Sequence, residues 1–154
     1  MDYILKEMEI KELKETMELV KRVFDEFEAP YYTKRGIKNF YKFANYNNIK
    51  DQLNKNTHIF ITKHENKIIG MIAIRNYSHI SLLFVDKKYH RKKIATRLLE
   101  EAKLYCRQNN KNVKEITVNS SRYGIKFYHA TGFKDTGLEQ EMDGIIFIPM
   151  ELKI

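Results

Sequence analysis

The sequence is poor in the residue types that cross-link, kink or divide a chain. Its 154 residues include one cysteine, Cys106, so no internal disulfide can form and the chain suits a reducing compartment. Two prolines and six glycines are too few for a linker rich in either residue, and there is no repeat or low-complexity tract. We therefore expect a single domain that spans residues 1–154.

Long apolar stretches are also absent. The apolar runs are short, as in MIAI at residues 71–74, and none is long enough to cross a bilayer. The N-terminal segment MDYILKEMEIKELKE carries charges throughout and lacks the apolar segment of a signal peptide. These features predict a cytoplasmic protein without membrane association.

Positive charge is present in excess. The composition, 43% hydrophobic and 31% charged, is typical of a soluble globular protein, and the formal net charge is +8. Such an excess suggests an anionic partner. Nucleic acid, a membrane surface and a phosphorylated cofactor are all anionic, so composition alone does not choose among them.

Helical and strand-like periods alternate along the chain. Apolar residues spaced by three or four from Ile10 to Phe27 indicate a helix that should end near Ala29-Pro30. Further helices are expected within residues 33–54, from Ile94 to Cys106, and at 125–130. The segments with strand-like composition are residues 3–9, 58–63, 67–76, 79–86, 115–119 and 144–152.

The order of these segments predicts a mixed α/β fold. A helix lies between the apolar LLFV strand at 82–85 and the strand at 115–119, which implies at least one parallel pair. Pro149 lacks a backbone N–H, so the last strand is expected to lie at an edge or to be bulged there.

A basic loop precedes the helix that begins at Ile94. Five of the seven residues from Lys87 to Lys93 are Lys or Arg. The first N–H groups of a helix lack internal partners and carry partial positive charge, so this end suits a phosphate group. A solvated charge run is the alternative. A nucleic-acid patch is disfavoured, because Tyr89 is the only aromatic residue there and the helix carries two consecutive glutamates.

Residues 82–102, LLFVDKKYHRKKIATRLLEEA, resemble the acetyl-CoA-binding motif of the GNAT superfamily of N-acetyltransferases. That motif is an apolar strand followed by Arg/Gln-x-x-Gly-x-Gly/Ala at the start of a helix. His90 takes the Arg/Gln position, Lys93 the first Gly position and Ala95 the last position. His90 and Lys93 depart from the pattern, and Lys93 replaces a glycine that permits unusual backbone angles.

Residues 118–133, VNSSRYGIKFYHATGF, resemble the second GNAT motif, in which a strand leads to a helix that carries a tyrosine and ends in Gly-Phe. Tyr128 and Gly132-Phe133 match it. The two motifs together imply a mixed central sheet of about six to seven strands, flanked by about four helices and splayed between the fourth and fifth strands.

The resemblance also implies an activity. It is an acetyl-CoA-dependent N-acetyltransferase that moves an acetyl group directly to a primary amine of a small molecule or peptide. A non-catalytic acyl-CoA-binding or regulatory module of the same fold is the alternative, which Lys93 favours and Tyr128 opposes.

Roles for individual residues follow from the same resemblance. Pantetheine should pair with the backbone of Phe84 and Val85, and a bulge near Leu82–Leu83 should direct an N–H at the acetyl oxygen. Tyr128 is the expected general acid, and the alternative is that it is a tyrosine of the core. His79 is a candidate base, and the alternative is that it is an ordinary polar strand residue. The remaining residues assigned to cofactor binding are Leu83, His90, Arg91, Lys92, Lys93, Ile94, Ala95, Thr96, Asn119, Ser121 and Phe127.

The acceptor is expected near residues 25–32, DEFEAPYY. Phe27, Glu28, Tyr31 and Tyr32 suit a cationic amine through ion pairing and cation–π contact, although a helix end with a hydrophobic plug is equally compatible. No His/Cys/carboxylate spacing suggests a metal site. Nucleic acid is not an expected partner, and exposed strand edges are compatible with a homodimer.

Overall fold

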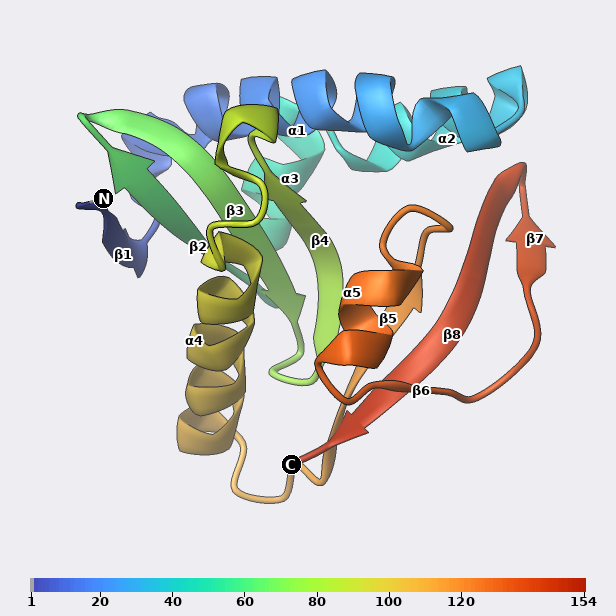
Figure 1. Ribbon diagram of the computed structural model, residues 1–154. Coiled ribbons are helices and arrows are strands. Elements are labelled where there is room, and N and C mark those ends of the chain that lie inside the picture. Colours follow the sequence, from blue (N-terminus) through green and yellow to red (C-terminus); the bar gives the residue numbers. More distant parts are fainter. Residues whose placement is uncertain (1) are drawn as a thin grey trace.

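An eight-stranded sheet with helices on both faces forms the protein, and the computed structural model describes residues 2–154 (Figure 1). The strands are β1 (Ile4–Glu7), β2 (Thr57–His64), β3 (Lys67–Arg75), β4 (His79–Val85), β5 (Glu115–Ser120), β6 (Lys134–Asp135), β7 (Gln140–Met142) and β8 (Ile145–Lys153). The helices are α1 (Leu13–Phe27), α2 (Lys34–Phe43), α3 (Tyr46–Leu53), α4 (Ile94–Asn109) and α5 (Ile125–Ala130). This architecture confirms the predicted mixed α/β fold.

The sheet runs in the order β1-β2-β3-β4-β5-β8-β6, and β7 pairs with β8 beyond that path. Every neighbouring pair is antiparallel except β4 and β5, which are parallel and joined through α4, as the sequence predicts. None of the helices within residues 2–154 has the length and apolar character to span a membrane.

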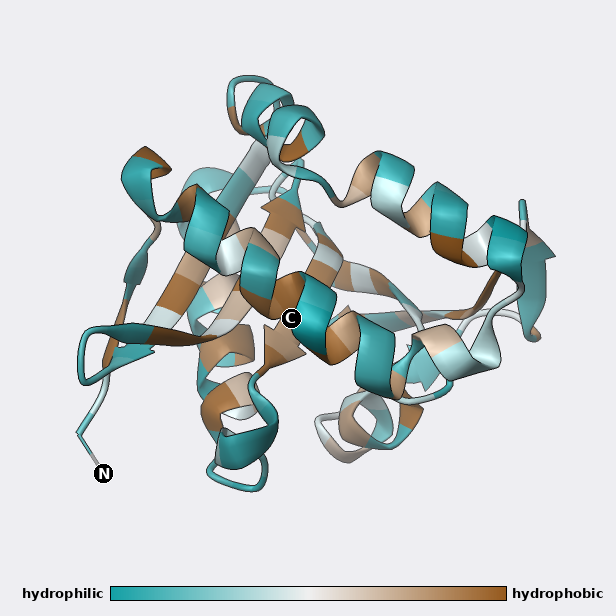
Figure 2. Ribbon diagram, turned by 90° about the horizontal axis from the view of Figure 1, so that it is seen from above, coloured by the Kyte–Doolittle hydropathy of each residue, from teal (hydrophilic) through white to brown (hydrophobic). Residues whose placement is uncertain are grey.

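Helices α1, α2 and α3 cover one face of the sheet. The buried residues of α1 include Leu13, Met17, Val20 and Phe24, which recur at spacings of three and four along one side. Figure 2 shows mostly hydrophilic residues on the outer side of α1, above hydrophobic strands. The burial of this stripe against β3 and β4 fixes the position of the C-terminal end of α1 beside the site described below.

The region 33–54 forms two helices, where the sequence analysis marks one helical region. The backbone leaves the helical conformation at Ala44, and the side chain of Asn45 accepts a hydrogen bond of 2.9 Å from the N–H of Asn48. Asparagine is a favoured N-cap residue, so Asn45 ends one helix and begins the next.

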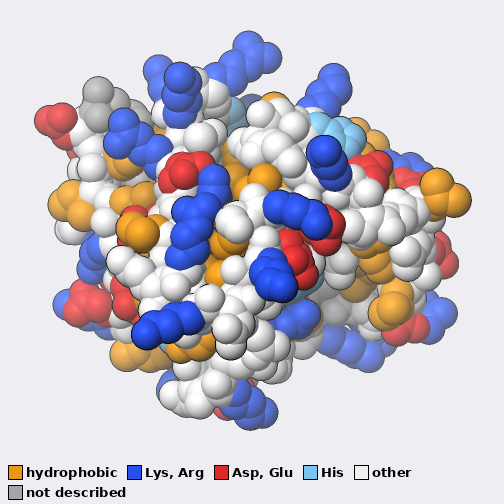
Figure 3. Space-filling model, turned by 90° about the horizontal axis from the view of Figure 1, so that it is seen from below, with side chains coloured by type: hydrophobic (Ala, Val, Ile, Leu, Met, Phe, Trp, Pro, Cys, Tyr) orange, Lys and Arg blue, Asp and Glu red, His pale blue; other side chains and the backbone are white. Residues whose placement is uncertain are grey.

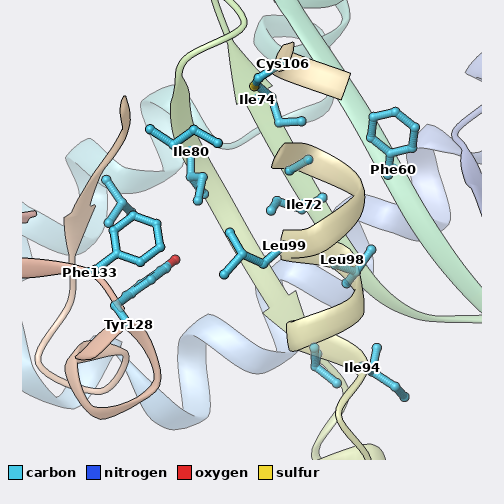
Figure 4. Close-up of a cluster of buried hydrophobic side chains, with 14 of the residues drawn as sticks. Phe60, Ile72, Ile74, Ile80, Ile94, Leu98, Leu99, Cys106, Tyr128 and Phe133 are labelled. Atoms are coloured by element: carbon cyan, nitrogen blue, oxygen red, sulfur yellow. The ribbon is translucent and has the colours of Figure 1, made fainter. Parts of the chain in front are cut away.

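Helices α4 and α5 cover the opposite face. Figure 4 shows Leu98 and Leu99 of α4 facing Ile72 and Ile80 of the sheet, in the same cluster as Tyr128. Alternate residues of β2 serve the two cores, because successive side chains of a strand point to opposite faces. Ile59 and Ile61 join the core under α1, whereas Phe60 joins the core under α4.

The last strand corrects one prediction. β8 pairs with β5 on one side and with β6 and β7 on the other, so it is not an edge strand. The Pro149 carbonyl accepts a hydrogen bond of 2.8 Å from the Thr136 N–H. The N–H position of Pro149 therefore faces the side of β8 on which β6 and β7 lie, at the gap between the residues that pair with β6 and those that pair with β7. The missing N–H of Pro149 therefore costs no ladder hydrogen bond.

Candidate active site

A cavity of about 1090 Å³ lies where β4 and β5 diverge. The two strands pair only at His79↔Thr117 and Ile80↔Val118, and beyond these residues the sheet is splayed, as the resemblance implies. The cavity walls come from β4, the loop after it, the start of α4, the end of β5 and α5, together with α2 and the β7–β8 turn. A volume of this size exceeds the upper end of the usual range for small-molecule pockets, about 300–1,000 Å³, so the cavity can hold an elongated ligand and a second small one.

A bulge in β4 sets which backbone groups face the cavity. Ala73 pairs with Leu82 and Ile74 pairs with Ile80, so Ser81 is the extra residue of β4. The bulge thus precedes the predicted position by one residue. Bulges re-aim the strand next to them, and this one lies at the point where β4 leaves β5.

The register identifies the open backbone groups of β4. Asp86 N–H donates to the Ile69 carbonyl at 2.8 Å, and alternate residues of an antiparallel strand face the same neighbour. Phe84 therefore turns its N–H and C=O toward β3, so its backbone does not fit the predicted pantetheine pairing, although its side chain lines the cavity. Leu83 and Val85 present their backbone groups to the splayed side.

The loop before α4 supplies a row of free amides. From Arg91 to Thr96 the backbone N–H groups find no acceptor among residues 2–154. Lys93 is the N-cap of α4 with φ 61° and ψ 19°, and Arg91 has φ 65°, so both occupy the left-handed region that favours glycine. Lys93 thus keeps the backbone shape that a glycine would adopt at this motif position. The unpaired strand edge, the free amides and the cations together fit the diphosphate and pantetheine arm of acetyl-CoA.

His90 lies between the loop and the strand edge. Its Nε2 is 2.8 Å from the Val85 carbonyl oxygen, and its ring packs 5.2 Å from Phe27 of α1 and 6.4 Å from Tyr123 before α5. Phe27 and Tyr123 stack at 4.9 Å. These three rings connect α1 with both sides of the splayed sheet, so Phe27 shapes the entrance and does not line the cavity.

Tyr128 extends from α5 toward β4, with its hydroxyl at the tip of the side chain (Figure 4). The residue is 6% exposed, and its hydroxyl has no hydrogen-bond partner among residues 2–154. Burial, and secondarily the nearby carboxylate of Glu28, raise the pKa of Tyr128 well above its ordinary value. A phenol in these surroundings stays protonated at neutral pH, and the raised pKa makes it a weaker acid than a free tyrosine.

Glu28 follows the last residue of α1 and lines the same cavity. Burial raises the pKa of Glu28 from 4.5 to about 7, and the Ser121 hydroxyl opposes this shift in part. The Glu28 charge also raises the pKa values of Tyr32 and Tyr123, after the larger effect of burial. A carboxyl group that titrates near neutral pH is suited to accept a proton.

His79 lines the closed end of the cavity, where β4 and β5 still pair. Its Nδ1 lies 2.8 Å from Thr117 Oγ1. Burial, assisted by the charge of Arg75, lowers the pKa of His79 from 6.5 to about 4. At neutral pH the imidazole is therefore uncharged and a weak base.

Most residues expected at the site do line this cavity. The exceptions are Lys92, Phe27 and Tyr31, and Tyr31 is 47% exposed. The sequence analysis missed a second group of lining residues, which come from α2 and the β7–β8 turn: Asn39, Phe40, Phe43, Met142, Asp143, Ile145 and Phe147. The Asp143-Gly144 pair is a hairpin-turn signal, and it could have marked the turn in advance.

Comparison with known proteins identifies the family. Residues 28–154 match the family model described as an acetyltransferase (GNAT) domain. The chain belongs to the GNAT acetyltransferase family. GNAT acetyltransferases take the acetyl group from acetyl-CoA, so the predictions of family, enzyme class and cofactor are confirmed.

Individual relatives are distant. The uncharacterized protein YxbD of Bacillus subtilis (strain 168) is 33% identical over 72 residues, which make up 46% of this chain and only 45% of YxbD. The PaiA N-acetyltransferase of Thermoplasma acidophilum, solved with coenzyme A, is 22% identical over 100% of both chains with a TM-score of 0.79. The ribosomal-protein-S18-alanine N-acetyltransferase of Escherichia coli is 15% identical, covers 99% of this chain and 94% of its own, and has a TM-score of 0.70. At these identities the two solved structures show a shared GNAT fold.

Proposed function

We propose that this GNAT protein transfers an acetyl group directly from acetyl-CoA to a primary amine, with Tyr128 as general acid. The single observation that carries the proposal is the unpartnered Tyr128 hydroxyl in the cavity that also contains the open edge of β4. The presence of coenzyme A in the PaiA structure supports the same cofactor here.

The chain would hold the cofactor mainly through its backbone. The free amides from Arg91 to Thr96 would receive the diphosphate, and the Leu83 carbonyl and the Val85 N–H would pair with the pantetheine amides. Arg91, Lys92 and Lys93 are exposed and add positive charge around the same loop. Asn119, Ser121 and Phe127 border the path of the arm, from β5 and α5.

Bound acetyl-CoA supplies a thioester carbonyl as the electrophile. Glu28 would take a proton from the attacking amine, since its carboxyl titrates near neutral pH while His79 is a weak base there. The Tyr128 hydroxyl would give its proton to the departing sulfur as the C–S bond breaks. The Leu83 N–H, just past the Ser81 bulge, would donate to the acetyl oxygen, a contribution of about 3 kcal/mol.

The surface charge gives little support to nucleic-acid binding. Figure 3 shows lysine and arginine side chains dispersed over one face and interleaved with acidic and neutral groups. A homodimer through the exposed strand edges stays a prediction.

The proposal is tested by thiol release from acetyl-CoA with a panel of primary amines, compared between the wild type and Tyr128→Phe. Loss of the hydroxyl should lower kcat by about 10²–10⁴-fold. Calorimetric affinity for acetyl-CoA should stay the same. Tyr123→Phe is the matched control, because its hydroxyl lies in the same cavity and points to His90 at 3.4 Å. Acetyl-CoA binding without turnover of any amine would instead support a non-catalytic acyl-CoA-binding module.

A further inference from the structure

The β7–β8 turn is locked onto α2 at a contact between two glycines. Gly36 lies in the first turn of α2, and Gly144 lies in the turn with φ 83°. A Cβ placed on Gly36 would fall 2.0 Å from the Gly144 carbonyl oxygen, and a Cβ on Gly144 would fall 2.5 Å from Gly36 N. No other residue fits either position without displacement of the backbone.

Polar contacts hold the same junction on both sides. Arg35 forms an ion pair of 2.8 Å with Asp143, and Asn39 Nδ2 donates to the Asp143 carbonyl at 2.7 Å. In Figure 1 the upper ends of β7 and β8 lie under α2. We call this junction of Gly36, Gly144, Arg35, Asn39 and Asp143 the α2–hairpin latch.

The latch forms part of the cavity wall. Asn39 and Asp143 line the cavity as well as joining the two elements, so α2 and the turn form one continuous wall. The two glycine backbones touch at this junction, so an extended peptide cannot pass between α2 and the β7–β8 turn there. The cavity volume of about 1090 Å³ must also contain the pantetheine arm.

The wall is apolar and carries little free negative charge. Phe40, Phe43, Ile145 and Phe147 line it. Among residues 2–154 the carboxylates that line the cavity are Glu28 and Asp143, and Asp143 is already paired with Arg35. One uncompensated carboxylate beside an apolar wall matches a ligand with one ammonium group and an apolar body.

We propose that the acceptor is a small primary monoamine with an apolar body, bound within the cavity, and that the α2–hairpin latch excludes peptides. The proposal rests on the acetyltransferase function above. It names the acceptor class, and it assigns selectivity to a contact remote from the reacting atoms.

The first test compares kcat/KM for 2-phenylethylamine, 1,4-diaminobutane and a hexapeptide with a free α-amino group. We expect the monoamine to exceed the peptide by about 100-fold or more. Equal or better use of the peptide, or preference for the diamine, overturns the proposal while leaving the transferase function intact. Binding of acetyl-CoA without turnover of any of the three amines overturns the transferase function, and this proposal with it.

The second test opens the latch. Gly36→Ala introduces the clash, whereas the double variant Arg35→Ala/Asn39→Ala removes the polar contacts without adding atoms and serves if the first variant fails to fold. Each should reduce the monoamine-to-peptide ratio by about tenfold with unchanged acetyl-CoA affinity. Gly137→Ala is the control, because its Cβ would meet Pro149 and not α2. An unchanged ratio in a folded latch variant overturns the selectivity role.

Discussion

The free-energy cost of the left-handed backbone conformation at Lys93 can be measured. A residue with a Cβ pays roughly 1–2 kcal/mol in this conformation, and glycine avoids that cost. Glycine also lowers stability by roughly 0.5–1 kcal/mol through the entropy of the unfolded chain. Lys92 is the matched reference, since it is the adjacent exposed lysine and is not among the residues with positive φ. Lys92→Gly has the same destabilising increase in unfolded-state entropy, but it relieves no backbone strain.

The two variants lose the same charge and gain the same unfolded-state entropy, so the difference between them isolates the backbone strain. Lys93→Gly should therefore be more stable than Lys92→Gly by about 1–2 kcal/mol, or about 2–8 °C in Tm for a chain of this size. Urea denaturation of both variants measures the difference. Calorimetry should still detect acetyl-CoA binding to Lys93→Gly, because the variant keeps the backbone N–H. Equal stabilities would refute the claim that Lys93 is strained.

Two further predictions concern the titrating groups of the cavity. The pKa of Glu28 rises from 4.5 to about 7 on folding, so its stabilising contribution is present below pH 4.5 and is lost as the pH increases through 7. Glu28→Gln should then be more stable than the wild type by about 3 kcal/mol at pH 8 but not at pH 4, and equal effects at both pH values in chemical denaturation would contradict this. His79 has its pKa lowered to about 4, so His79→Gln should leave the rise of kcat/KM near pH 7 in place, whereas Glu28→Gln should remove it. A pH–rate profile in which His79→Gln alone abolishes that rise would restore the histidine as base.

Local sequence signals were sufficient to predict those features that depend on a single helix, strand or loop. The apolar spacing of α1 predicted its buried face, and the two motifs placed Tyr128 and the loop before α4 in one cleft. Lys93 at a glycine position marked the residue where the backbone is unusual, but it did not tell whether a lysine keeps the glycine conformation, as the φ of 61° shows that it does. The break at Asn45 was missed although asparagine is a favoured N-cap, because the apolar pattern continues through it.

Contacts between distant segments could not be predicted in the same way. The pKa of Glu28 depends on its burial in the cavity and on Ser121, more than 90 residues further along the chain, and no property of the segment DEFEAPYY contains that information. The strand register likewise depends on a bulge that no residue type specifies, which is why the sequence analysis expects a pairing at Phe84, whose backbone groups face β3.

The glycine contact shows why a turn signal alone does not give a function. Asp143-Gly144 specifies a tight hairpin by its local conformation, yet its partner Gly36 lies in another element and would be read as a weak point of a helix. Only the folded sheet brings the backbones of Gly36 and Gly144 together. The contact then requires that neither residue has a side chain. The acceptor wall is therefore a property of the tertiary arrangement, and a chain with the same two motifs but a side chain at position 36 or 144 would carry a wider acceptor site.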